Sequence, residues 1–480
     1  MRLLLIPRIS EVTKGQSTTI QTVAFVRSVI ECDPHARVDI VMSEKFAGEK
    51  WIHRYLPPDW PHHDRVGFIH LDLGYTEARK MGFTAGFELY KFMKPTGGDR
   101  FFYDAVISTA FASHPQIRSF LQRDWSKAMK RTVPLIGWSL WTATEDSRNM
   151  WKIFTSSKYD VLSEVMGSMV SDLLVFESEI VKKEHLTTYR KYLKPTVIGE
   201  IMDRSIVASN GAQTDRIPVK TEYRDPPRAL FSGYYNEHGE CVAKAMLDAY
   251  RAGKISSMTF NFFGHERKEQ PPEWLINEAA SNPNVTITGN IPFSEYLEML
   301  GDHEIFGSMT YDGTYGIRFA EAMAAGLLPV VHSTLKETFL PSDYPFHTDS
   351  PSKFREVFFA ALAELLSGPD MAIAVAKRIR ELHDTSTNMA SMYKAIGDVV
   401  LGKRSEMTYK PYWEAVKEAM ADAPDEIGHD DACKRIAVLT RNKLQLSKNA
   451  MFPPGCIRWA ILDCGFEDVG GDTPVYRRIR

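Results

Sequence analysis

The segment with the clearest potential for chemistry is a glycine-bearing loop that runs into an amphipathic helix, residues 311–326. The backbone N–H groups of Thr314, Tyr315 and Gly316 would stand at the start of that helix, where unpaired amides and the helix dipole favour an anion such as a diphosphate. Glu321 follows one helical turn later, at a place suited to a hydroxyl-rich group such as a ribose. For an isolated loop, the better interpretation would be that Gly313 and Gly316 are turn glycines and that Glu321 is a solvated helix residue, so the functional interpretation depends on the surrounding sequence.

Short apolar runs alternate with longer amphipathic stretches along most of the chain, which is typical of βαβ units around parallel sheets. In the first half, the predicted strands cover residues 3–6, 38–41, 66–71, 105–107, 135–138 and 173–176, and a seventh apolar run covers 195–198. In the second half they cover 229–231, 258–263, 285–288, 305–308 and 328–331, with helices at 241–252, 293–300 and 317–325. We therefore predict an α/β protein with two doubly wound, Rossmann-like units and a ligand cleft between them.

A polar segment, residues 209–227, separates the two sets of strands and contains Asn210-Gly211 and Pro226-Pro227, as expected of an interdomain linker. The predicted domains are residues 1–215, residues 226–400 and a small basic C-terminal module at 411–480. In that module two amphipathic helices precede a hairpin that Gly470-Gly471 would turn. This order is compatible with a winged-helix-like arrangement.

The loop and helix also match a known pattern. Glu321 begins Glu-Ala-Met-Ala-Ala-Gly and is followed by Leu-Pro-Val-Val, while Asn284-Val285 and Gly289-Asn290-Ile291-Pro292 precede the loop at sensible spacing. Residues 229–331 resemble the donor site of the retaining GT-B glycosyltransferases, in the glycogen-synthase-like branch with an E-x7-E signature. The resemblance implies a GT-B fold, an acceptor domain followed by a nucleotide-sugar domain, and metal-independent transfer of a sugar, for example from a UDP-sugar.

The chain departs from the family pattern at two places. The first Glu of the signature falls on Gly313 without a gap, or on Asp312 with one extra residue, and we favour Asp312 as the carboxylate that contacts a sugar hydroxyl. The family's Arg and Lys after the first strand of the second domain fall near Tyr234 and His238. Other cations would then have to neutralise the diphosphate. The expected donor-binding residues are Gly15, Gly233, Arg267, Lys268, Gly313, Thr314, Tyr315, Gly316 and Arg318.

Two candidates lie in the first domain. Gly15, in the loop before the first helix, would face the cleft, although a surface loop with a Ser cap explains it equally well. His114, after the strand at 105–107, is the predicted histidine near the donor sugar, and its alternative role is to start a helix. With Asp312 and Glu321 it completes the expected catalytic set.

Charge is distributed unevenly along the chain. The 480 residues carry 58 Lys and Arg against 61 Asp and Glu, a formal net charge of −3. Residues 432–480 contain nine basic and four acidic residues, a net charge of +5. Such a segment suggests a nucleic-acid partner, and we expect the acceptor to be a hydroxylated base in double-stranded DNA, as in phage DNA glycosyltransferases. The expected DNA contacts are Lys434, Arg435, Arg441, Lys443, Arg458, Arg477 and Arg478.

Other functions remain compatible with the sequence. The basic tail could instead dock on the acidic remainder of the chain. The acceptor could be a glycan or a small molecule. The same fold would also suit a non-catalytic sugar-nucleotide-binding protein or an epimerase. Five widely spaced cysteines indicate a reducing compartment, so we expect a cytoplasmic protein. We expect no metal site and no membrane anchor, since the cysteines lack paired spacing and no apolar run approaches about 20 residues.

Overall fold

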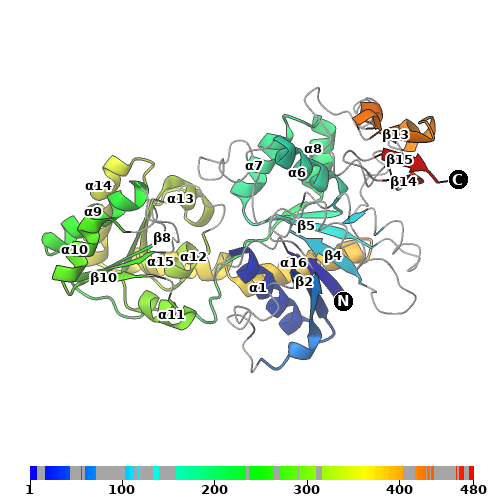
Figure 1. Ribbon diagram of the computed structural model, residues 1–480. Coiled ribbons are helices and arrows are strands. Elements are labelled where there is room, and N and C mark those ends of the chain that lie inside the picture. Colours follow the sequence, from blue (N-terminus) through cyan, green and yellow to red (C-terminus); the bar gives the residue numbers. More distant parts are fainter. Residues whose placement is uncertain are drawn as a thin grey trace. The chain divides into compact units, whose positions relative to one another are not determined.

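The computed structural model divides into two compact units, residues 1–208 with 389–480, and residues 209–388 (Figure 1). It describes residues 1–7, 17–43, 56, 60–71, 103–109, 111, 114, 117–118, 121, 133–139, 158–233, 237–262, 271–289, 291–309, 316–403, 417–428, 430–432, 434–436, 461, 464–469 and 475–479. The boundary after residue 208 lies at the start of the predicted linker. The predicted C-terminal module is grouped with the first unit.

The first unit is built on a parallel sheet with strand order β3-β2-β1-β4-β5-β6-β7. The strands are β1 Arg2–Ile6, β2 Arg37–Ser43, β3 Val66–Leu71, β4 Ala105–Ser108, β5 Leu135–Ser139, β6 Leu173–Phe176 and β7 Ser205–Val207. Its helices are α1 Ser17–Cys32, the 3-10 turn η3 His63–Arg65, α6 Lys158–Val170, α7 Glu179–Tyr189 and α8 Pro195–Asp203. The central strands are fully buried, which explains their continuous apolar runs.

One predicted strand of this unit is wrong. The apolar run at 195–198 opens helix α8, and the last strand of the sheet is β7, a few residues later. Pro195 stands at the first helical position, where its missing N–H costs nothing because that amide would have no partner in the helix. A run of four residues is too short for its periodicity to separate a buried strand from the start of a helix.

The second unit holds a five-stranded parallel sheet with strand order β10-β9-β8-β11-β12. Its strands are β8 Arg228–Gly233, β9 Ser257–Phe262, β10 Val285–Thr288, β11 Ile305–Ser308 and β12 Leu328–Val331. The helices are α9 Glu237–Arg251, α10 Glu273–Ser281, α11 Phe293–Gly301, α12 Ile317–Ala324, α13 Ser333–Phe339, α14 Pro351–Ser367 and α15 Asp370–Leu382. Helix α9 packs on α14, and α12 packs on α15 (Figure 1).

The predicted linker, residues 209–227, belongs to the second unit. An isolated bridge pairs Ala212 with Asp384, and Thr385 donates a hydrogen bond to the carbonyl of Asn210 at 2.9 Å. Helix α16, Thr385–Val400, then carries the chain from the second unit back to the first, where Met389 and Met392 are buried in its core. The segment is therefore a packed part of the second unit rather than a free connection.

The C-terminal region contains a small antiparallel sheet with strand order β13-β15-β14, formed by β13 Glu426–Gly428, β14 Phe466–Asp468 and β15 Val475–Arg478. Strands β14 and β15 pair antiparallel, with Phe466 opposite Arg478 and Asp468 opposite Tyr476, whereas the predicted turn at Gly470-Gly471 lies outside the described residues. Phe466 and Tyr476 are buried in the same apolar cluster as the core of the first unit. The region is thus continuous with that unit's core.

No single helix in the described ranges is long and apolar enough to cross a membrane; α14 and α15 pass such a test only as a pair bent by 99°.

Candidate functional site

The candidate site lies at the carboxyl edge of the second sheet. Strands β8, β9 and β10 follow one another in one direction, whereas β11 and β12 continue on the other side of β8. The chain therefore reverses direction between β8 and β11, and in sheets of this kind ligands bind beside the carboxyl ends of the strands at that switch point. The connection from β11 to α12, which contains the predicted anion-binding loop, starts there.

Helix α12 begins directly after Gly316, whose carbonyl accepts hydrogen bonds from the N–H groups of Phe319 at 2.9 Å and Ala320 at 3.1 Å. A Cβ on Gly316 would lie 2.5 Å from Cε2 of Phe319 and closer still to Cδ2, so only glycine fits against this ring. Phe319 is itself buried and packs on Phe306 of β11, with ring centroids 5.5 Å apart. The glycine thus allows the first turn to pack tightly against the strand that precedes it.

Arg318 stands in this first turn and provides the predicted cation. Its Nη1 donates to the Oδ1 of Asn261 at 3.4 Å, and its guanidinium carbon lies 5.5 Å from the ring centroid of Tyr296 on α11. The hydroxyl of Tyr296 in turn donates to the backbone carbonyl of Arg318 at 3.4 Å. Arg318 is half-buried, so a positive charge is held next to the N-terminus of α12, where the helix dipole has the same sign.

Asn261 is a functional candidate that the sequence analysis missed. It is fully buried at the carboxyl end of β9, and its Nδ2 donates to Thr288 Oγ1 at 2.8 Å and to the carbonyl of Gly289 at 2.7 Å. These two bonds leave its Oδ1 facing Arg318, with the hydroxyl of Ser232 at 3.4 Å. An amide side chain near the end of the otherwise mostly apolar run at 258–263 was the available signal.

Glu321 is buried, whereas the sequence of an isolated loop and helix would place it on a solvated helix face. Its side chain is only 4% exposed and belongs to the buried stretch from Phe319 to Ala324. A carboxylate so poorly hydrated binds hydroxyl groups more strongly than one in water. This placement is compatible with the predicted contact to a sugar or ribose.

Of the remaining predicted donor-binding residues, Gly233 is the last residue of β8, where a Cβ would make only ordinary contact, 3.4 Å, with the ring of Phe231. The predicted catalytic acid Asp312 lies outside the described residues. The same holds for the other predicted donor-binding residues, which are Gly15, Arg267, Lys268, Gly313, Thr314 and Tyr315. Their roles stay predictions. The structure brings Gly316, Arg318 and Gly233 to the same edge of one sheet.

Comparison with solved structures identifies the fold. Sucrose-phosphate synthase from Thermosynechococcus elongatus superimposes with a TM-score of 0.56 at 13% sequence identity, covering 84% of this chain and 99% of that one. HepE from Anabaena, solved in complex with UDP-glucose, gives 0.53 at 10% identity, covering 83% and 100%. TarM gives 0.55 at 10% identity, covering 82% and 98%.

The chain has the GT-B fold. The predicted α/β class with two Rossmann-like units is thereby confirmed. No protein-family model matches the sequence, and no curated protein matches it. The fold is therefore recognised through its three-dimensional arrangement.

His114 lies inside the first unit of this GT-B chain rather than at its surface. Its side chain is completely buried, Nδ1 shares a hydrogen bond with Ser171 Oγ at 2.8 Å, and the ring packs on Phe111 with centroids 4.7 Å apart. Burial lowers the pKa of His114 to about 3, so the imidazole is neutral near pH 7. The imidazole has no exposed surface in this conformation, and the catalytic role of His114 stays a prediction.

The four predicted DNA contacts that the structure describes are all engaged within the protein. Lys434 pairs with Asp431 at 3.0 Å, Arg435 donates to the carbonyl of Ala419, Arg477 pairs with Glu426 at 3.2 Å, and Arg478 donates to the carbonyls of Met420, Ala421 and Ala423. Lys434 and Arg477 remain more than half exposed. Arg441, Lys443 and Arg458 lie outside the described residues.

Within the described part of the chain, no three His, Cys, Asp or Glu side chains come together as a metal site would require. The positive groups located at the candidate site are Arg318 and the N-terminus of α12.

Proposed function

We propose that this protein transfers a sugar from a nucleotide-diphosphate sugar to an acceptor hydroxyl, with retention of configuration at the anomeric carbon. The observation that carries the proposal is Arg318 in the first turn of α12, held by Asn261 and Tyr296 at the switch point of the second sheet. The resemblance of the segment from Glu321 to Val331 to the retaining branch supports the stereochemistry. HepE, of the same fold, was solved with UDP-glucose.

The chemistry assigned to the site is the neutralisation of the leaving group. The acceptor oxygen forms a bond to the anomeric carbon while the bond from that carbon to the β-phosphate oxygen breaks. The electron pair of that bond, and the acceptor proton, leave with the nucleoside diphosphate. Negative charge therefore grows on the diphosphate, where Arg318 and the amides at the start of α12 stabilise it. Glu321, with Asp312 in the loop before the helix, would hold hydroxyl groups of the donor.

Donor use is tested with the full chain and UDP-, GDP- and ADP-glucose, following release of the nucleoside diphosphate in the presence of acceptor. Replacing Arg318 with Gln removes a charge-assisted contact worth about 1.5–3 kcal/mol, so kcat/KM should fall about 10- to 150-fold. Arg251→Gln is the matched control, because among the described residues Arg251 pairs with Glu278 alone, at 3.0 Å, on the surface of the same unit. Tight binding of a sugar nucleotide without turnover on any acceptor would favour a binding protein instead.

We further propose that the acceptor is a hydroxymethylated base in double-stranded DNA. Support comes from the net charge of +5 over residues 432–480 and from the strand order of the small sheet. Strand β13, which has helical residues on both sides in the sequence, pairs with β15, and β15 also pairs with β14. The resulting strand order, β13-β15-β14, is the order found in winged-helix domains. Because Arg435 and Arg478 are tied to backbone carbonyls, phosphate contacts would fall to Lys434, Arg477 and the basic residues at 441, 443 and 458.

The acceptor is tested by incubating the protein with a donor panel and DNA containing hydroxymethylated or unmodified pyrimidines, followed by nucleoside mass spectrometry. A truncation before the module would expose the apolar surface that Phe466 and Tyr476 cover, so point substitutions are the cleaner variants. Arg477→Gln should lower the slope of log affinity against log salt by about 1, and Arg251→Gln should leave it unchanged. Sugar transfer to a glycan or small molecule with DNA unmodified would refute the DNA acceptor alone.

A further inference from the structure

The C-terminal end of α12 is held by the segment that precedes the second sheet. Residues 220–224, named the strap here, run past that end: the Lys220 N–H donates to the carbonyl of Ala325 at 3.3 Å, and the Tyr223 hydroxyl donates to that of Gly326 at 2.9 Å. Arg380 of α15 donates to the preceding carbonyl, Ala324, at 2.9 Å. The carbonyl of the last helical residue and those of the two residues that follow it are thus all satisfied from outside the helix.

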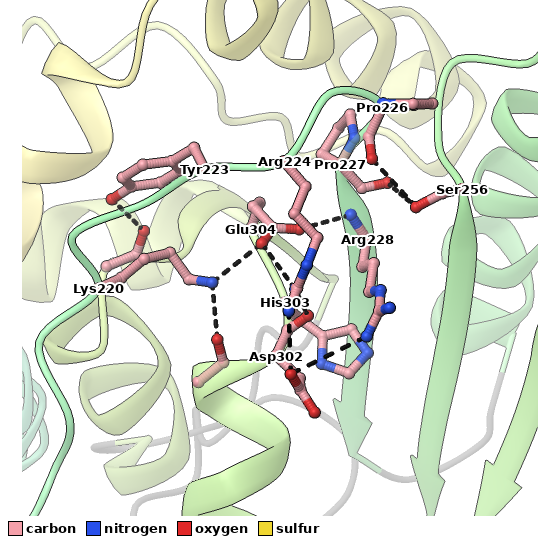
Figure 2. Close-up of polar contacts among 12 residues, drawn as sticks. Lys220, Tyr223, Arg224, Pro226, Pro227, Arg228, Ser256, Asp302, His303 and Glu304 are labelled. Carbon is pink, nitrogen blue, oxygen red and sulfur yellow. Dashed lines mark hydrogen bonds and ion pairs between the residues drawn. The ribbon is translucent and has the colours of Figure 1, made fainter.

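The strap also holds the C-terminal end of the neighbouring helix, α11. Lys220 Nζ donates to the carbonyl of Gly301 at 2.7 Å, and Arg224 Nη1 donates to that of Asp302 at 2.7 Å (Figure 2). Both contacts place a cation at the negative end of the helix dipole. One short segment therefore caps two helices side by side.

The strap is anchored by a buried carboxylate. Glu304, whose side chain has no exposed surface, accepts hydrogen bonds from Lys220 Nζ at 3.0 Å, Arg224 Nη1 at 3.1 Å and the backbone N–H of Arg228 at 2.7 Å (Figure 2). A buried charge without these partners would be strongly unfavourable, so the strap is held in one place. Burial, and then the charge of Glu304, raises the pKa of Tyr223 to about 12, which keeps its hydroxyl a donor at neutral pH.

The two capped helices meet again at the candidate site. At their opposite ends, Tyr296 of α11 contacts both the guanidinium and the carbonyl of Arg318 of α12. Helix α12 has eight residues and is therefore about 12 Å long. A helix this short moves as a rigid body, so a displacement at its C-terminal end moves Arg318 as well.

We propose that the strap is a positioning element for the donor site, in which Tyr223 and Lys220 set the location of Arg318 and of the N-terminal amides of α12. This inference rests on the proposed use of a nucleotide-diphosphate donor. Tyr223 touches no reacting atom in this scheme, and its effect is transmitted along the helix.

The test compares Tyr223→Phe with Tyr250→Phe. Tyr250 is an equally half-buried tyrosine at the same, amino-terminal edge of the same sheet, and its hydroxyl bonds Asn282 at 3.3 Å and Asn284 at 3.0 Å, away from α12. Tyr223→Phe loses one hydroxyl hydrogen bond and Tyr250→Phe loses two, so Tyr250→Phe should lower the urea midpoint at least as much. Only Tyr223→Phe should weaken binding of UDP, with GDP and ADP measured in parallel, by at least fivefold in calorimetry, and only it should accelerate amide exchange in α12.

The outcomes separate the two ideas. Donor KM should rise and kcat should fall in Tyr223→Phe, because Arg318 and the amides of α12 bind the diphosphate and also stabilise the charge that grows on it during transfer. Equal nucleotide affinities and equal exchange rates in the two variants would overturn the positioning role while leaving the transferase proposal intact. A parent chain that binds none of the three nucleotides would overturn the proposed function, and the inference with it.

Discussion

The substitution Gly316→Ala probes the junction between the predicted anion-binding loop and α12. The added methyl group would lie 2.5 Å from Cε2 and 3.0 Å from Cγ of Phe319, against the 3.5–4.0 Å of ordinary carbon contacts. The Phe319 side chain has little room to adopt another conformation, because it is only 7% exposed and packs on Phe306. Either this ring repacks or the first turn of the helix shifts by more than 1 Å, in proportion to the overlap.

The cost follows from that choice. Forcing an extra methyl group into a packed site usually costs about 1–3 kcal/mol, and a shifted first turn would in addition weaken the hydrogen bonds that Phe319 and Ala320 donate to the Gly316 carbonyl. We therefore expect the free energy of unfolding to fall by about 2 kcal/mol, with UDP binding weakened about tenfold because Arg318 moves with the turn.

Urea unfolding and calorimetric titration with UDP measure the two effects, and Gly199→Ala is the matched control. Gly199 lies within α8, and among the described residues nothing comes within 4 Å of a Cβ built there. The same substitution should therefore stabilise the protein by about 0.5–1 kcal/mol through helix propensity. A Gly316→Ala protein as stable as the parent, with unchanged UDP affinity, would refute the argument.

Three further predictions concern buried polar groups. Arg118→Met should lower the free energy of unfolding by about 3–5 kcal/mol in urea titrations, because Arg118 holds the buried Asp172 carboxylate through two bonds of 2.6 and 2.7 Å; a loss below 1 kcal/mol would contradict this. Burial lowers the pKa of His114 to about 3 in the folded protein, against about 6.5 in the unfolded chain, so the unfolded chain binds the proton more tightly. The free energy of unfolding should therefore decrease as the pH falls below 6.5, by about 2 kcal/mol at pH 5. His114→Gln should flatten that pH dependence of unfolding, and an unchanged slope would exclude this histidine as its source. Asn261→Asp places a carboxylate beside Arg318 and removes two donors, so UDP affinity measured by calorimetry should drop more than tenfold, and equal affinity would remove Asn261 from the site.

Several elements were predictable because their signal is local. The strands at 285–288, 305–308 and 328–331 have the bounds expected of them, since strands of a parallel sheet are short, continuous apolar runs between turn residues. The helix after the glycine loop begins at residue 317 as expected. Helices α10, α13 and α15 were not predicted from the sequence; α13 is short, and α10 buries only Leu275.

The sequence by itself determined the α/β class, the two sets of strands and the loop that leads into α12, because each depends on residues close together in the chain. Only the tertiary structure decided which side chains meet. Arg318 and Asn261 are 57 positions apart and come together because β9 and α12 reach the same edge of one sheet. His114 was expected at the cleft and is buried, in part because Ser171, 57 positions further along the chain, packs against it. Local patterns specify elements, whereas burial and charge pairing depend on how those elements pack.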